Sequence, residues 1–162
     1  MLRLPLVGLT STPLGDIPEG GLFYIADDEA ELALAMIVAD HGEHHRYVPL
    51  SGTRAFRVRR SEMRKGERGL VLPVRGEQLR LDVFEARPLS PIRAQPGDLV
   101  ATHEGPMLVD VGATHEPTGL RLSDGGLRTY QADYAFASWR LTFVDNGREH
   151  VLVERAPESV AR

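Results

Sequence analysis

The residues best suited to chemistry in this sequence form a histidine cluster, His41, His44 and His45. Imidazole nitrogens bind zinc, copper, nickel or iron, and Asp40 or Glu43 could add a carboxylate ligand. The cluster lies between strand-like runs, and sequence neighbours on a strand point to opposite faces, so His44 and His45 would not face one ion together. The cluster therefore predicts a polar surface turn first, and a transition-metal site or a pH-sensitive surface as alternatives.

A second candidate is the arginine-rich segment 54–68, and its residues proposed for binding are Arg57, Arg59, Arg60 and Arg64. Clustered positive charge can meet nucleic-acid phosphates. The segment contains one aromatic residue, Phe56, which we assign to the core, so no base-stacking platform is expected. Because the net charge of the chain is −4, we expect a solvated strand or an acidic protein partner rather than nucleic acid.

The remaining candidates are interpreted as structural. Gly15-Asp16 and Gly97-Asp98 each precede an aliphatic residue, which predicts turns whose carboxylates accept backbone N–H groups rather than catalytic acids. His103-Glu104 and His115-Glu116 are assigned to surface loops. No nucleophile elbow, phosphate loop, dinucleotide fingerprint or zinc-helix motif occurs. The absence of cysteine excludes disulfides, thiolate metal sites and a cysteine nucleophile.

The elements that must position these residues recur along the chain. The matching segments include Leu2-Arg3-Leu4 with Leu79-Arg80-Leu81, Gly15-Asp16-Ile17 with Gly97-Asp98-Leu99, and Phe56-Arg57-Val58 with Trp139-Arg140-Leu141. These ordered matches predict two diverged copies of one unit of about 80 residues, with chance similarity between β-rich halves as the alternative. The predicted units are residues 1–76 and 77–162, packed tightly together with pseudo-twofold symmetry because no flexible linker separates them.

The matched segments alternate apolar and polar residues with the period of a β-strand. They predict an all-β fold with at most one short helix and roughly six short strands in each unit, arranged as small barrels or a sandwich. Residues 28–36 combine an acidic start with strong helix formers, so a short helical turn near Asp28 followed by a strand through Val38 is expected. Phe56 and Trp139 are predicted to occupy equivalent buried positions.

Composition indicates a globular protein, with 42% hydrophobic and 26% charged residues. The N-terminal apolar run is too short for a signal peptide, and no stretch reaches membrane-spanning length, which predicts a soluble cytoplasmic protein with no membrane partner. We expect a non-enzymatic binding or assembly module, without a cofactor, that presents loops or sheet edges to a protein partner or forms a homodimer. The alternative is a small metal-dependent enzyme that uses the region of His41, His44 and His45.

Overall fold

The computed structural model describes residues 8–26, 31–39, 45–60, 66–74, 76–89, 93–109 and 117–156. Within these ranges the regular structure consists of β-strands and short 3-10 turns, without an α-helix, which confirms the all-β prediction. The described residues also contain no helix with both the length and the apolar character needed to cross a membrane.

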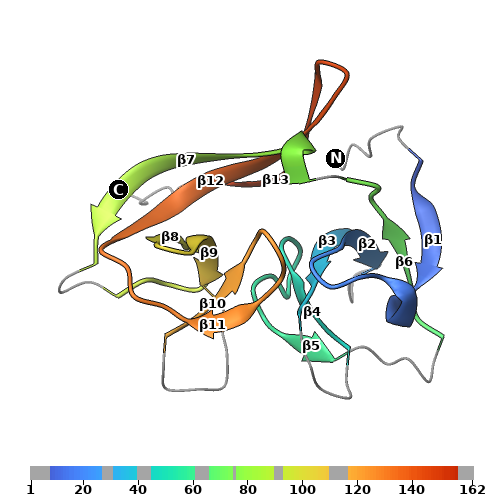
Figure 1. Ribbon diagram of the computed structural model, residues 1–162, viewed down its shortest axis with the longest axis horizontal. Coiled ribbons are helices and arrows are strands. Elements are labelled where there is room, and N and C mark those ends of the chain that lie inside the picture. Colours follow the sequence, from blue (N-terminus) through green and yellow to red (C-terminus); the bar gives the residue numbers. More distant parts are fainter. Residues whose placement is uncertain are drawn as a thin grey trace.

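The first sheet has the strand order β1-β6-β2-β3-β4-β5, and all neighbours are antiparallel. It lies to the right in Figure 1. Its strands are β1 (Thr10–Pro13), β2 (Leu22–Ala26), β3 (Leu32–Ile37), β4 (Arg46–Pro49), β5 (Arg59–Arg60) and β6 (Arg68–Val71). The 3-10 turn η1 (Leu14–Asp16) follows β1. Strands β2 and β3 are apolar almost throughout, because both of their faces are buried.

The second sheet is antiparallel and contains longer strands. It is formed by β7 (Leu79–Pro88), β8 (Leu99–Thr102), β9 (Gly105–Val109), β10 (Thr118–Arg121), β11 (Leu127–Thr129), β12 (Tyr134–Asp145) and β13 (Arg148–Arg155). The 3-10 turn η3 (Gly76–Gln78) precedes β7. Strand β12 pairs along one edge with β7, and along its other edge first with β8 and then with β13. Figure 1 shows β7 and β12 running together above the rest of the molecule.

The two sheets share a strand order. In the first sheet the last strand, β6, lies between β1 and β2, and the order continues through β3, β4 and β5. In the second sheet β12 lies in the same way between β7 and β8, and the order continues through β9, β10 and β11, with β13 added. This equality of order is what a duplication of one unit predicts, and the duplication stays a prediction.

The two sheets enclose one shared core, and a smaller apolar cluster lies on the other face of each sheet. The shared core joins side chains of both halves, among them Tyr24, Met36 and Leu50 with Leu108, Trp139 and Phe143. Smaller clusters lie on the other faces, one around Phe23 and Tyr47 and one around Val100 and Met107. Because the main core draws on both halves, each half depends on the other for burial.

A backbone hydrogen bond and an isolated β-bridge connect the two halves at the turn before β11. The amide of Ala39 donates to the carbonyl of Gly125 at 2.8 Å, beside a parallel bridge between Ala39 and Gly126. Gly125 has φ +77°, and a Cβ there would meet the carbonyl oxygen of Ile37. A side chain at this position would therefore strain the turn and separate the two sheets.

The structure corrects one local expectation, for Phe56, and confirms another, the strand after residue 31. Phe56 was expected to begin a strand equivalent to that of Trp139, and this is wrong: Phe56 is half-buried in a turn with φ +68°, whereas Trp139 is buried within β12. The rings instead contact each other edge to face, with centroids 6.4 Å apart. The expected strand after residue 31 is present as β3, while the possible helical turn near Asp28 lies outside the described residues.

Candidate functional site

The structure leaves the predicted histidine site untested. His41 and His44 lie outside the described residues, and His45 is half-buried just before β4. Within the described ranges, no group of three or more His, Cys, Asp or Glu residues is arranged to hold a metal ion. A metal site at this cluster therefore stays a prediction, to be tested by metal analysis of the purified protein and of its His41→Ala variant.

The predicted arginine surface is only partly assembled in the described residues. Arg59 and Arg60 form β5, a two-residue strand at the edge of the first sheet. Its partner is β4, where Arg46 lies opposite Arg60, so like charges meet across the pair. Arg57 is exposed after the turn that contains Phe56, and Arg64 lies outside the described residues. Binding by these arginines stays a prediction.

Asp98 forms a buried ion cluster. Its exposed fraction is 0%, and its carboxylate accepts the Gln95 amide at 2.8 Å, as expected for a turn. It also accepts the guanidinium groups of Arg87 on β7 and Arg155 on β13, the latter at 3.3 Å. These donors come from distant parts of the chain, so Asp98 ties β7 and β13 to the start of β8. The prediction of a structural carboxylate is supported, and the arginine clamp adds a role that the sequence did not indicate.

The Gly97-Asp98 turn also lies against Phe56, a residue of the first half of the chain. The Trp139 indole donates to the carbonyl of Gly97 at 2.8 Å, and the Arg155 guanidinium stacks over the Phe56 ring at 5.5 Å. A Cβ at Gly97, where φ is +88°, would meet the Phe56 ring. Asp16, by contrast, is exposed at the end of η1. The two Gly-Asp pairs are therefore not structurally equivalent.

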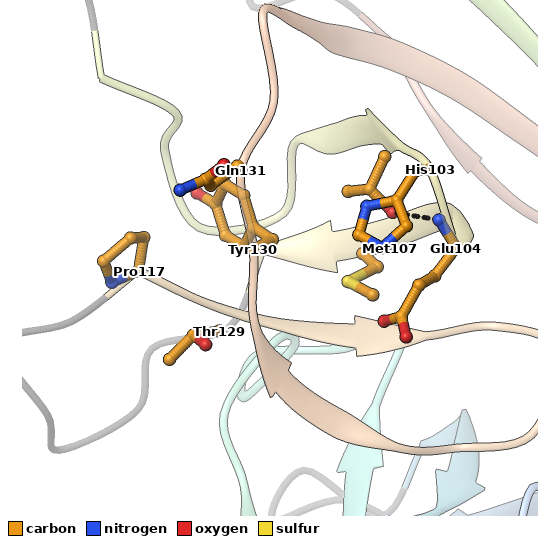
Figure 2. A pocket seen from close by; sticks show the side chains of 8 residues that line it. His103, Glu104, Met107, Pro117, Thr129, Tyr130 and Gln131 are labelled. Atoms are coloured by element: carbon orange, nitrogen blue, oxygen red, sulfur yellow. Dashed lines mark hydrogen bonds between the residues drawn. The ribbon is translucent and has the colours of Figure 1, made fainter.

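A cavity of about 430 Å³ opens at the β8–β9 turn and is shown in Figure 2. The described residues that line it are Thr102, His103, Glu104, Met107, Pro117, Thr129, Tyr130 and Gln131. The Thr102 hydroxyl donates to the Gly105 carbonyl at 2.8 Å and accepts the Glu104 amide at 3.2 Å, which fixes the turn. The prediction that His103-Glu104 lies in a surface loop is confirmed.

The charges around this cavity are already paired. The Glu104 carboxylate lies 3.7 Å from Arg121 and 3.5 Å from Arg128. Burial, together with the negative charge of Asp98, raises the pKa of Tyr130, so its phenol stays protonated at neutral pH. The described lining thus includes a carboxylate held by two arginines and a protonated phenol.

A larger cleft of about 810 Å³ lies between the two halves. It is lined mainly by apolar side chains, including Leu22, Leu72, Leu79 and Leu81, and Ser123 is the single polar side chain among its described lining residues. Specific ligand sites combine apolar walls with a few convergent polar groups. The described residues of this cleft provide no such set.

One edge of β7 is unpaired in the described structure. The strand has 10 residues, and in the described structure it pairs with β12 alone, so its other edge carries unpaired backbone groups. Glu85, with φ +51°, interrupts the regular strand conformation. The uninterrupted part therefore runs from Leu79 to Phe84.

Exposed apolar side chains gather on the same layer. The large hydrophobic residues that are exposed in the described chain are Val83 (41%), Phe84 (42%), Tyr134 (53%) and Val151 (48%). All four belong to β7, β12 or β13. Val83 and Phe84 are neighbours on β7 and point to opposite faces, so these residues mark the layer on both of its faces.

The outer face of this layer also carries ordered charges. Arg80 donates to Glu149 at 2.5 Å and to Asp82 at 3.2 Å, and Arg140 stacks over Phe84 at 5.8 Å while pairing with Glu154. The hydrogen bond from Arg80 holds the pKa of Glu149 below its usual range. Strand β7 thus presents alternating apolar and charged side chains beside its free edge.

The sequence carries a signal for this surface in two adjacent large apolar residues, Val83 and Phe84. The alternation in Leu79-Arg80-Leu81 predicts a strand, and Val83 and Phe84, which are adjacent, must point to opposite faces of it. At least one large apolar side chain therefore had to lie away from the core or against a partner.

Comparison of the chain with protein-family models, curated proteins and solved structures finds no match in any of the three.

Proposed function

We propose that this protein is a non-enzymatic binding or assembly module that recruits a protein partner by adding a strand to the free edge of β7. The observation that carries the proposal is the unpaired edge of β7, a strand of 10 residues, together with two exposed large hydrophobic side chains on the same strand, Val83 and Phe84. In strand addition, backbone hydrogen bonds provide affinity and alternate side chains provide specificity.

Other features support binding rather than catalysis. The buried carboxylate of Asp98 is occupied by Gln95, Arg87 and Arg155, so it has no free role as an acid or base. On the β7 side, Leu79 and Leu81 pack against the shared core and hold the strand in place. A rigid strand with an open edge binds a partner at a low cost in conformational entropy.

Site-specific photo-crosslinking tests the proposal. A photo-reactive amino acid replaces Val83, and the matched control replaces Thr10, an exposed residue of β1, which is the corresponding edge strand of the first sheet. We expect a defined protein adduct from position 83, identified by mass spectrometry, and no adduct from position 10. The adduct should be lost when one of two prolines, Leu81→Pro or Asp82→Pro, is combined with the probe. Successive strand residues point their N–H groups to opposite edges, so one of the two removes a donor from the free edge.

Equal labelling from positions 83 and 10, or no adduct from position 83, would contradict the proposal. A folding control is needed for Leu81→Pro, because Leu81 also contacts the core. The circular dichroism spectrum of each proline variant should keep its β-sheet signal, so that loss of the adduct is not mistaken for loss of the fold.

A further inference from the structure

We propose that the strand added to β7 is β7 of a second copy of this chain, in an antiparallel register centred on Leu81. This inference rests on the proposed function of the β7 edge and names the partner. The pairing would join two second sheets into one continuous sheet across a two-fold axis perpendicular to it. It is argued from the length of the regular edge, the faces of its side chains and their charges.

Geometry restricts the possible registers. Residues that face each other across an antiparallel pair point to the same side of the sheet. A two-fold axis perpendicular to the sheet therefore places one residue of β7 opposite itself, and its neighbours pair symmetrically about that residue. The regular edge begins after η3 (Gly76–Gln78) and ends before Glu85, whose φ is +51°. The centre must lie near the middle of residues 79–84.

Charge selects one centre among these. A centre at Asp82 would set that carboxylate against the partner's Asp82, and a centre at Arg80 would oppose two guanidinium groups. A centre at Val83 would place the interrupted position, Glu85, opposite Leu81. The centre at Leu81 instead sets each Arg80 opposite the partner's Asp82, on both sides of the axis.

The same register covers apolar surface. Leu79 and Val83 lie on the face of β7 that includes Leu81, and they become cross-strand partners when Leu81 lies on the axis. Val83 is 41% exposed, and Leu79 is half-buried beside the shared core. On the outer face, Arg80 and Asp82 are exposed enough to meet a partner, with side-chain exposures of 45% and 34%. Both faces of the edge are therefore complementary to a second copy.

Charge reversal with a mixing step tests this register. Arg80→Asp gives a chain with two acidic residues at positions 80 and 82, and Asp82→Arg gives a chain with two basic ones. Each variant alone would place like charges opposite each other twice, so we expect self-association about tenfold weaker than in the wild type. An equimolar mixture places opposite charges at both positions and should form a heterodimer.

Sedimentation velocity provides the measurement. The wild type and the Arg148→Asp control, which changes an exposed charge on the β12–β13 hairpin, should show concentration-dependent dimers. The single variants should reach the same dimer fraction only at concentrations about tenfold higher, and their mixture should form dimers at the wild-type concentrations. Thermal unfolding of each variant checks that the fold is kept, because Arg80 also pairs with Glu149.

Three results would overturn the inference: a wild type that stays monomeric up to about 1 mM, a dimer insensitive to both reversals, or a mixture that remains monomeric. These outcomes are separable from failure of the proposed function. If position 83 crosslinks to a different protein while the wild type is monomeric, strand addition at β7 stands and self-pairing fails. If position 83 gives no adduct at all, both fail.

Discussion

The two halves of the molecule follow one strand order but differ in the lengths of corresponding strands. Strand β1 has 4 residues and β6 has 4, whereas their counterparts β7 and β12 have 10 and 12. The second sheet also carries β13, which follows β8 along the same edge of β12. The shared order builds the common core, while Val83, Phe84, Tyr134 and Val151, all exposed, lie on β7, β12 and β13 of the second sheet.

The difference concerns both the edge proposed for binding and the contacts that stabilise the fold. A short edge strand such as β1 or β5 offers few backbone groups to a partner, while β7 offers a regular edge of several residues. The second half also contains the buried Asp98 cluster, which has no counterpart at the exposed Asp16. The comparison therefore predicts unequal effects at corresponding positions of the two halves.

The largest expected difference is between the two aromatic residues that meet across the halves. Trp139→Ala removes a side chain that is 1% exposed together with its hydrogen bond to Gly97, so it should lower the free energy of unfolding by about 3–5 kcal/mol. Phe56→Ala should cost less, because Phe56 is half-buried in a turn. Urea unfolding monitored by circular dichroism measures both. Equal losses would mean that the two positions are equivalent after all.

A smaller difference is expected between the two Gly-Asp turns. Asp98→Ala leaves the guanidinium groups of Arg87 and Arg155 without their shared carboxylate, at a cost of about 3 kcal/mol, the lower end for a broken buried pair because both arginines keep some contact with water. Asp16→Ala should change stability by less than about 0.5 kcal/mol, because the side chain is exposed. Chemical denaturation compares them, and similar costs would reject the asymmetry.

The smallest effects concern one tyrosine in each half. Burial raises the pKa of Tyr24 and of Tyr130, so folding favours the neutral phenols, and this contribution is lost as pH rises above about 10. Tyr24→Phe and Tyr130→Phe should each reduce the alkaline loss of stability. The Tyr24 hydroxyl is buried without a hydrogen-bond partner in the described structure, so Tyr24→Phe should also leave stability at neutral pH unchanged or slightly higher.

Thermal melts between pH 7 and pH 11 measure this effect. A steeper alkaline loss in either variant would contradict the direction of the pKa change. A clear loss of stability in Tyr24→Phe at pH 7 would mean that its hydroxyl has a stabilising partner.

Much of the fold could be predicted from the sequence, because it depends on local patterns. Alternating residues in Leu79-Arg80-Leu81 and in Trp139-Arg140-Leu141 predicted strands, and the structure forms β7 and β12 there. The matched segments predicted two related halves, but the prediction that Phe56 and Trp139 occupy equivalent positions was wrong. The strand that corresponds to β12 in the shared order is β6 (Arg68–Val71), which the local match could not identify.

The candidate site was less predictable, because it depends on contacts between distant residues. Arg87 and Arg155 reach Asp98 only because β7 and β13 pair with β12, and no local pattern encodes that convergence. A free edge likewise depends on which strands pair, so the sequence could suggest an edge-binding protein without identifying β7. The arginine-rich composition of segment 54–68 suggested a binding surface, yet β5 contains only Arg59 and Arg60 of these arginines.

Amide hydrogen exchange at the β7 edge is the most direct test of association through this strand. Exchange is measured by mass spectrometry at protein concentrations about a thousandfold apart, so that a dimer forms at the higher one. We predict that residues 79–84 gain protection at high concentration, while residues 10–13 of β1, the corresponding edge of the first sheet, do not change. Equal exchange of residues 79–84 at both concentrations, or protection gained at β1 instead, would contradict pairing through β7.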